Sequence, residues 1–201
     1  YAPTQGVMGS RAIVADMLKV SAEKVHFIAI NVGGSFGMKG SMFPEYLCCL
    51  HGARELGRAV KWTDKRSDSF LSDHHGRDQE FEGELALDKD GNFLALRFNG
   101  FGNLGSYLTQ MGPLFSTLNI VKHAISLYKT PLIELNTKVV FTHTVPITAY
   151  RGAGRPEGNY YMERLIDAAA AEMGMDPVKL RRKNHIKKSQ IPYMAPSGSE
   201  Y

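Results

Sequence analysis

The chain has 201 residues, of which 43% are apolar and 22% are charged, close to the average for globular proteins. This composition excludes disorder as the main state, and no apolar run is long enough to span a bilayer. The formal net charge is +4, and the one basic run, residues 179–188, is more typical of a solvated helix face than of a nucleic-acid site. We therefore expect binding neither to nucleic acid nor to membranes.

The only two cysteines, Cys48 and Cys49, are adjacent in sequence. Neighbouring cysteines rarely form a disulfide, and the chain has no C-x-x-C motif to hold zinc or an iron–sulfur cluster. This usage predicts a reducing compartment, the cytoplasm, and places any iron–sulfur chemistry on another chain.

The first half of the chain alternates helical and extended patterns. In chain order, the expected elements are a helix over 10–19, a strand over 24–32, a helix over 44–56 and a short strand over 59–63. Ser10 is a candidate N-cap of the first helix, Pro44 suits the first turn of the second, and Gly57 is placed to end it.

The second half adds a long hairpin, a third strand and two further helices. In chain order, we expect strands over 79–87 and 93–99, an irregular glycine-rich segment over 100–113, a strand over 132–141, a helix over 157–173 and another from 177 onward. Asp176 is the expected cap of the last helix, and Tyr161, Leu165 and Ala169 are expected to face the core from the helix before it. Together these elements predict a mixed α/β (α+β) fold.

Two patterns that suggest ligand sites fail when their surroundings are considered. Residues 100–105 match G-x-G-x-x-G, but the preceding strand belongs to a hairpin and no helix opens after the motif, as a dinucleotide site requires. His74 and His75 have no further metal-ligating residue at a suitable spacing, so we expect them to be solvated.

Two loops are more informative. The glycine loop, residues 33–40, is either a tight strand-to-helix turn or a place where backbone N–H groups approach an anion or oxo group. In the arginine loop, residues 149–155, Arg151 and Arg155 flank a flexible turn just before a helix N-terminus. Such a turn suits a phosphate or carboxylate, although a surface loop with salt bridges would have the same composition.

Three motifs in a fixed order carry a family resemblance. They are Thr4-Gln5, then Gly-Gly-x-Phe-Gly at 33–37, then Ala-Tyr-Arg-Gly-Ala-Gly-Arg-Pro-Glu at 149–157. With them the chain resembles the molybdopterin-binding large subunits of the xanthine dehydrogenase, aldehyde oxidase and carbon monoxide dehydrogenase family. The resemblance covers essentially all 201 residues, and it implies that 1–201 form part of the molybdopterin-binding domain, an internal piece lacking the C-terminal segments of the full subunit.

The resemblance also implies a site. It places Gln5, Phe36 and Arg151 close to the molybdenum without making them its direct ligands. The cofactor-binding set that it implies is Gln5, Gly34, Phe36, Gly37, Arg151 and Gly152. The family's general base, a Glu in a Val-Gly-Glu segment, is expected beyond Tyr201, so no catalytic residue is expected within the chain.

By the same resemblance, the parent protein is a molybdenum hydroxylase that oxidises an aldehyde or an aromatic heterocycle with oxygen from water. It would carry molybdopterin in the cytosine dinucleotide form and pass electrons to an iron–sulfur small subunit and an FAD-binding medium subunit, in a dimer of heterotrimers.

Departures from the family patterns leave alternatives open. The sequence of the arginine loop resembles that of the second form of carbon monoxide dehydrogenase-like large subunits. Gly152 occupies the position at which the first form has a copper-binding cysteine. Gly40, Asn119 and Ala153 stand where purine hydroxylases carry Glu, Arg and Phe, which argues against a purine substrate. The alternatives are carbon monoxide dehydrogenase-like activity, or a non-catalytic α/β module that binds anions or partners through the arginine loop.

Overall fold

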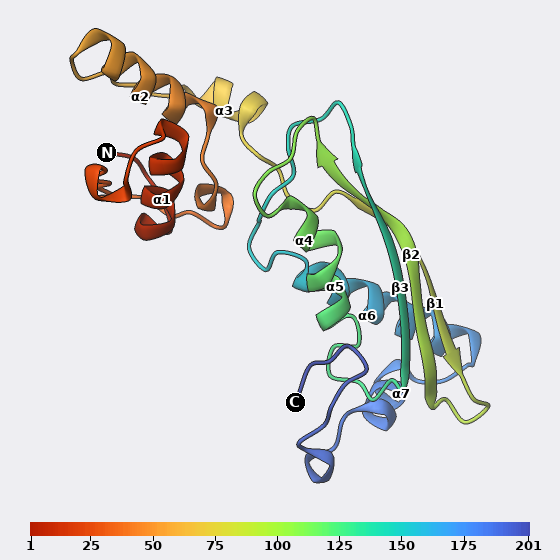
Figure 1. Cartoon of the computed structure of the whole chain (residues 1–201). Helices are drawn as coiled ribbons and strands as arrows, with labels where there is room; N and C mark the ends of the chain where they lie inside the picture. The colour runs from red at the N-terminus through yellow and green to blue at the C-terminus, as the bar shows by residue number, and fades with distance from the viewer.

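The computed structural model describes residues 1–201 and has two parts (Figure 1). The N-terminal part, residues 1–73, is helical, and the C-terminal part, residues 74–201, contains the sheet and the remaining helices. The predicted mixed α/β fold is confirmed. No helix combines the length and the apolarity that crossing a bilayer would require.

The N-terminal part consists of helices and turns joined by irregular segments, the longest of which are residues 25–37 and 57–65. The helices and turns are α1 (Val7–Leu18), the 3-10 turns η1 (Ala22–Lys24) and η2 (Met38–Gly40), α2 (Pro44–Leu56) and α3 (Arg66–Ser72). The predicted limits of α2 are confirmed, with Pro44 in its first turn and Gly57 in the left-handed conformation at its end. The prediction of Ser10 as an N-cap is wrong, because α1 begins at Val7 and Ser10 lies buried inside it. The hydroxyl of Ser10 instead shares a 2.6 Å hydrogen bond with that of Thr4.

The strands predicted over 24–32 and 59–63 are wrong. Both segments lie outside the sheet, and their backbone groups find no ladder partner. The first is held to the start of the chain by a single backbone bond, from Ala2 N–H to the Ile28 carbonyl at 3.1 Å. An apolar β-rich sequence becomes a strand only where a second strand pairs with it, and local sequence does not supply that partner.

The C-terminal part is built on a three-stranded sheet. Its strands are β1 (Gln79–Leu87), β2 (Phe93–Gly105) and β3 (Leu132–Phe141), in the order β1-β2-β3. β1 and β2 form the predicted antiparallel hairpin, and β3 pairs with β2 in parallel. β2 runs further than the predicted 93–99, so residues 100–105 belong to the strand. This placement confirms that their G-x-G-x-x-G pattern is not a phosphate loop.

Helices pack beside this sheet and close the core. They are α4 (Gly112–Ser116), α5 (Leu118–His123), α6 (Arg155–Glu172), α7 (Pro177–Asn184) and the 3-10 turn η3 (Lys188–Gln190). α6 packs against β1 on one side and α5 on the other. Its most buried apolar residues are therefore Met162, Ile166 and Ala170. The residues predicted to face the core each precede one of these by one position, and they are only half-buried. The predicted cap of α7 is confirmed, since Asp176 Oδ1 accepts a 2.8 Å hydrogen bond from Lys179 N–H.

Candidate functional site

Three segments that are distant in sequence meet where the two parts of the molecule join. The side-chain oxygen Oε1 of Gln5 accepts a 3.1 Å hydrogen bond from the N–H of Gly37. The N–H of Arg151 donates a 2.9 Å hydrogen bond to the carbonyl of Phe36. The structure thus brings together the Thr-Gln motif, the glycine loop and the arginine loop.

Gly37 allows the two loops to touch. Its φ of +103° is a conformation that L side chains rarely adopt. A Cβ added at this position would lie 2.4 Å from the carbonyl oxygen of Ala149, which is far inside van der Waals contact. Only glycine therefore permits the glycine loop to approach the backbone of the arginine loop this closely.

Phe36 borders a cleft of about 690 Å³ at this junction. Its backbone is in the left-handed region (φ +52°), and its ring is 58% exposed. Gly34 leaves room for the ring, because a Cβ there would come within 2.7 Å of Phe36 Cε2. The cleft is lined by both glycine-loop and arginine-loop residues and by polar side chains, among them Gly34, Phe36, Lys39, Arg66, His74 and Tyr150.

The guanidinium of Arg151 has no hydrogen bond or ion pair within the chain, and the residue is exposed. Its backbone, by contrast, is held at both ends of the residue, by Phe36 at the N–H and by Arg77 Nη2 at the carbonyl. Arg155 behaves differently, since its Nη1 donates to the Gly152 carbonyl at 3.3 Å. Arg151 therefore presents a fixed backbone and an uncommitted planar cation at the edge of the junction.

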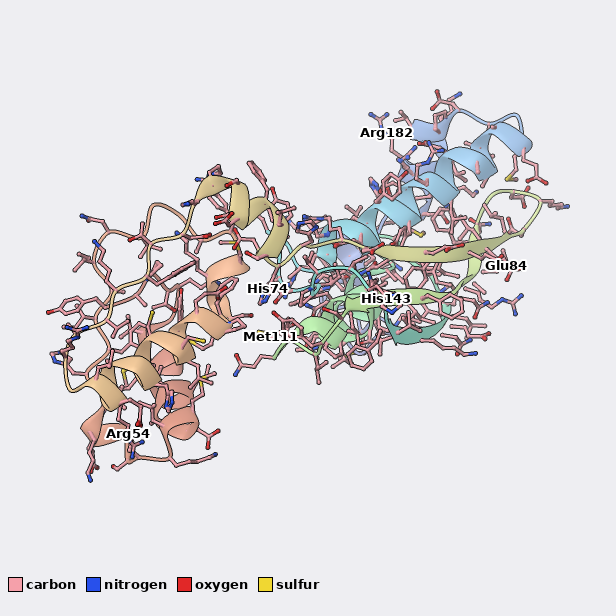
Figure 2. All side chains as sticks on the ribbon, turned by 90° about the horizontal axis from the view of Figure 1, so that it is seen from above. Arg54, His74, Glu84, Met111, His143 and Arg182 are labelled. Atoms are coloured by element: carbon pink, nitrogen blue, oxygen red, sulfur yellow. The ribbon has the colours of Figure 1, made fainter.

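His74 lies where the chain passes from one part to the other, as Figure 2 shows. The expectation that His74 is solvated is wrong, because the residue is only 8% exposed. Its ring stacks on Phe43 with 4.6 Å between centroids, and Nε2 lies 3.4 Å from the hydroxyl of Tyr107. Burial lowers the pKa of His74, while Asp73 and Glu45 act in the opposite direction. His75, in contrast, is exposed as expected.

Arg77 is a part of the junction that the sequence did not reveal. It follows the histidine pair and contacts the arginine loop only through the fold. Neither its neighbours in sequence nor its spacing from any motif distinguishes it from other surface arginines. Only the path of the folded chain brings it to the loop.

These groups can be tested against a molybdopterin, which carries phosphate and oxo oxygens and a broad ring system. The Arg151 guanidinium is an uncommitted donor, and the Gln5 amide keeps its Nε2 donors because Oε1 is the atom that accepts from Gly37. The positive-φ glycines let the loops pack closely enough to hold the exposed Phe36 ring and the Arg151 guanidinium at one place, because a Cβ at Gly34, Gly37 or Gly152 would strike Phe36, Ala149 or Pro156. The residues present fit such a group.

Comparisons with known proteins agree with this geometry. Residues 1–185 match the family model described as the molybdopterin cofactor-binding domain. The chain is 36% identical to 6-hydroxypseudooxynicotine dehydrogenase complex subunit gamma of Paenarthrobacter nicotinovorans, over 94% of this chain and 24% of that subunit. It is 32% identical to the carbon monoxide dehydrogenase large chain of Hydrogenophaga pseudoflava, over 100% of this chain and 25% of the other.

A solved structure gives the same result at the level of the fold. Quinoline 2-oxidoreductase from Pseudomonas putida 86 superposes with a TM-score of 0.93 at 32% identity, covering 98% of this chain and 25% of that one. The chain thus spans about a quarter of the length of the relatives it matches. It belongs to the molybdopterin cofactor-binding family, whose members here are molybdenum-dependent oxidoreductases.

Proposed function

We propose that the chain forms one side of the cofactor cradle in a molybdenum hydroxylase that oxidises an aldehyde or an aromatic heterocycle. The observation that carries the proposal is the pair of hydrogen bonds that joins Gln5 to Gly37 and Phe36 to Arg151. Together they gather all three family motifs around one exposed, uncommitted guanidinium.

Each residue has a role that its chemistry supports. The amide of Gln5 and the guanidinium of Arg151 donate hydrogen bonds to cofactor oxygens. Gly34, Gly37 and Gly152 allow the two loops to pack in the shape that presents these groups to the cofactor, because a side chain at any of the three would meet Phe36, Ala149 or Pro156. The exposed ring of Phe36 shields one side of the cleft from water. When bound, the molybdenum cofactor supplies the oxidation of the substrate carbon, with water as the source of oxygen.

The finer assignments are proposals of the same kind. The cofactor is the cytosine dinucleotide form, and segments outside residues 1–201 complete the cradle and carry the glutamate general base. Electrons leave through an iron–sulfur small subunit and an FAD-binding medium subunit in a cytoplasmic dimer of heterotrimers. Support comes from relatives named as a complex subunit gamma and as a large chain, which are parts of larger assemblies.

An aromatic heterocycle is the favoured substrate, because one of the matched enzymes is named for quinoline, which belongs to that class. Carbon monoxide oxidation is the second candidate, since two carbon monoxide dehydrogenase large chains are among the relatives. Gly152 argues against carbon monoxide oxidation, because it occupies the position at which the first form of the carbon monoxide dehydrogenase large subunit is expected to carry its copper-binding cysteine.

The test is to purify the parent complex that contains this chain and measure its molybdenum by elemental analysis. Acid hydrolysis followed by chromatography identifies the released nucleotide, with CMP as the expected product. A panel of quinoline, purine and aldehyde substrates and carbon monoxide then assigns the activity with an electron-accepting dye. A complex without molybdenum would leave the non-catalytic anion-binding module as the correct interpretation.

A further inference from the structure

Arg77 touches the arginine loop and the helix behind it at three places. Its Nη2 donates a hydrogen bond to the carbonyl oxygen of Arg151. Its guanidinium carbon lies 4.4 Å from the ring centroid of Tyr150, in a cation–π contact. Its Nε is 3.5 Å from Oε1 of Glu157, in the first turn of α6.

Glu157 makes this arrangement costly to disturb. Its side chain is only 8% exposed, and its Oε2 has no hydrogen-bond partner within the chain. Arg77 is the one cation that pairs with it. Removing the cation that pairs with a buried carboxylate strongly destabilises the fold, because the charge is then left without a partner. The ion pair with Glu157 therefore holds the Arg77 side chain in place.

The backbone just before Arg77 is also bound to the segment leading into the arginine loop. His75 N–H donates to the Pro146 carbonyl at 3.0 Å, and Thr148 N–H donates to the His75 carbonyl at 2.8 Å. A Cβ added to Gly76 would lie 2.5 Å from Cβ of Tyr150, which shows how closely the two segments pack. The backbone that carries the Arg77 side chain is therefore fixed relative to the arginine loop.

We propose that Arg77 is a positioning residue for Arg151. By binding the carbonyl of Arg151 while Phe36 binds its N–H, Arg77 fixes the backbone that carries the uncommitted guanidinium towards the junction. The planar fork of an arginine can hold a carbonyl, a carboxylate and an aromatic face at once, whereas the single ammonium of a lysine cannot. The importance of this positioning for catalysis rests on the proposed function.

The first experiment uses the assembled parent complex, and its readout is the order of the arginine loop and not the activity. The amide of Arg151, which donates to Phe36, is the reporter of loop order, and its hydrogen exchange is followed by mass spectrometry of peptides that cover the arginine loop, residues 149–155. Arg77→Gln should accelerate that exchange at least ~10-fold, because the loop loses a charge-assisted hydrogen bond. Arg97→Gln is the matched control, since Arg97 also pairs with carboxylates, Glu84 and Glu134, but on the exposed sheet surface. Equal exchange in both variants would overturn the proposal.

The second experiment separates positioning from simple stabilisation in the assembled enzyme. The double variant Arg77→Gln/Glu157→Gln removes both charges, so it should regain most of the melting temperature that Arg77→Gln loses. If Arg77 positions Arg151, kcat stays at least ~10-fold low in the double variant with normal molybdenum content, and KM changes little. Recovery of kcat together with the melting temperature would show a merely structural ion pair and overturn the proposal.

Arg77→Lys provides a third comparison. Lysine keeps the charge opposite Glu157 and should restore stability, but it should leave the Arg151 amide in fast exchange and kcat low. Full rescue by lysine contradicts the proposal. A wild-type complex without molybdenum would refute the proposed function, while the exchange measurement would still decide whether Arg77 orders the loop.

Discussion

The N–H of Arg151 donates a 2.9 Å hydrogen bond to the carbonyl of Phe36, a residue with left-handed backbone at the far side of the junction. This bond joins the two parts of the molecule at the place where the family motifs meet. It sets the backbone of both residues and leaves their side chains exposed. The Phe36 carbonyl and the Arg151 N–H are thus paired with each other, while the guanidinium of Arg151 is left free to donate to a ligand.

Arg151→Lys should lower turnover of the assembled enzyme at least ~10-fold, equivalent to ~1.4 kcal/mol in the transition state. The charge is kept, but the planar fork that would reach two cofactor oxygens is lost. Arg164→Lys on α6 is the control, because Arg164 is also exposed and makes no ion pair. Normal turnover of Arg151→Lys at normal molybdenum content would show that the Arg151 guanidinium does not bind the cofactor.

Gly37→Ala should destabilise the chain by about 1 kcal/mol or more, as measured by urea denaturation. The new methyl group would meet the Ala149 carbonyl, so the glycine loop and the arginine loop must separate. Gly33→Ala is a matched control, since Gly33 also has a positive φ (+68°), but a Cβ added there would have nothing within 4 Å. Similar losses in the two variants would mean that backbone strain, and not the contact with Ala149, determines the effect.

The caps and limits of individual elements could be predicted because they depend on neighbouring residues. Pro44 and Gly57 bound α2 through their own backbone conformations, and Asp176 caps α7 by accepting a hydrogen bond from Lys179 N–H three residues further on. The segment 24–32 could not be assigned correctly, because whether it becomes a strand depends on a partner strand elsewhere. The three motifs indicated which loops belong together, but not the bonds that join them.

The burial of His74 and the contacts of Arg77 could not be predicted from the sequence, because they also depend on residues that are distant along the chain. A histidine beside another histidine in a polar stretch gives no sign that Phe43 will stack on it. Likewise, the pairing of Arg77 with Glu157 depends on the path of the chain between β1 and α6. Such contacts are fixed by the packing of the two parts, which no local pattern encodes.

The burial of His74 predicts a pH dependence of stability. Its pKa in the folded chain lies below the ordinary value of 6.5, so the unfolded chain binds more protons as the pH falls. The free energy of unfolding should therefore be fully retained above pH 6.5 and should decrease as the pH falls below it towards the lowered pKa. Urea denaturation of the wild type and of His74→Gln between about pH 8 and 5 should show a flatter profile for the variant. The exposed His143 supplies the control His143→Gln, and an unchanged slope in His74→Gln would contradict the assignment.

The last prediction is that the 201-residue chain, expressed alone, folds but contains no molybdenum and no hydroxylase activity. It should fold because the sheet and α6 enclose a continuous apolar core. It should not retain the cofactor because Gln5, Phe36 and Arg151 are all exposed, so they offer one side of a large anionic ligand. Cofactor sites normally enclose about 70% or more of the ligand surface.

Activity should be absent for a separate reason, since the general base is expected outside residues 1–201. Circular dichroism and a cooperative urea transition would establish folding, and elemental analysis of the purified chain would measure molybdenum. Reconstitution with the remaining segments of the parent subunit is the positive control, because it should restore both metal and activity. Stoichiometric molybdenum in the isolated chain, or dye-linked oxidation of an aldehyde by it, would show that these residues enclose the cofactor more completely than the open junction suggests.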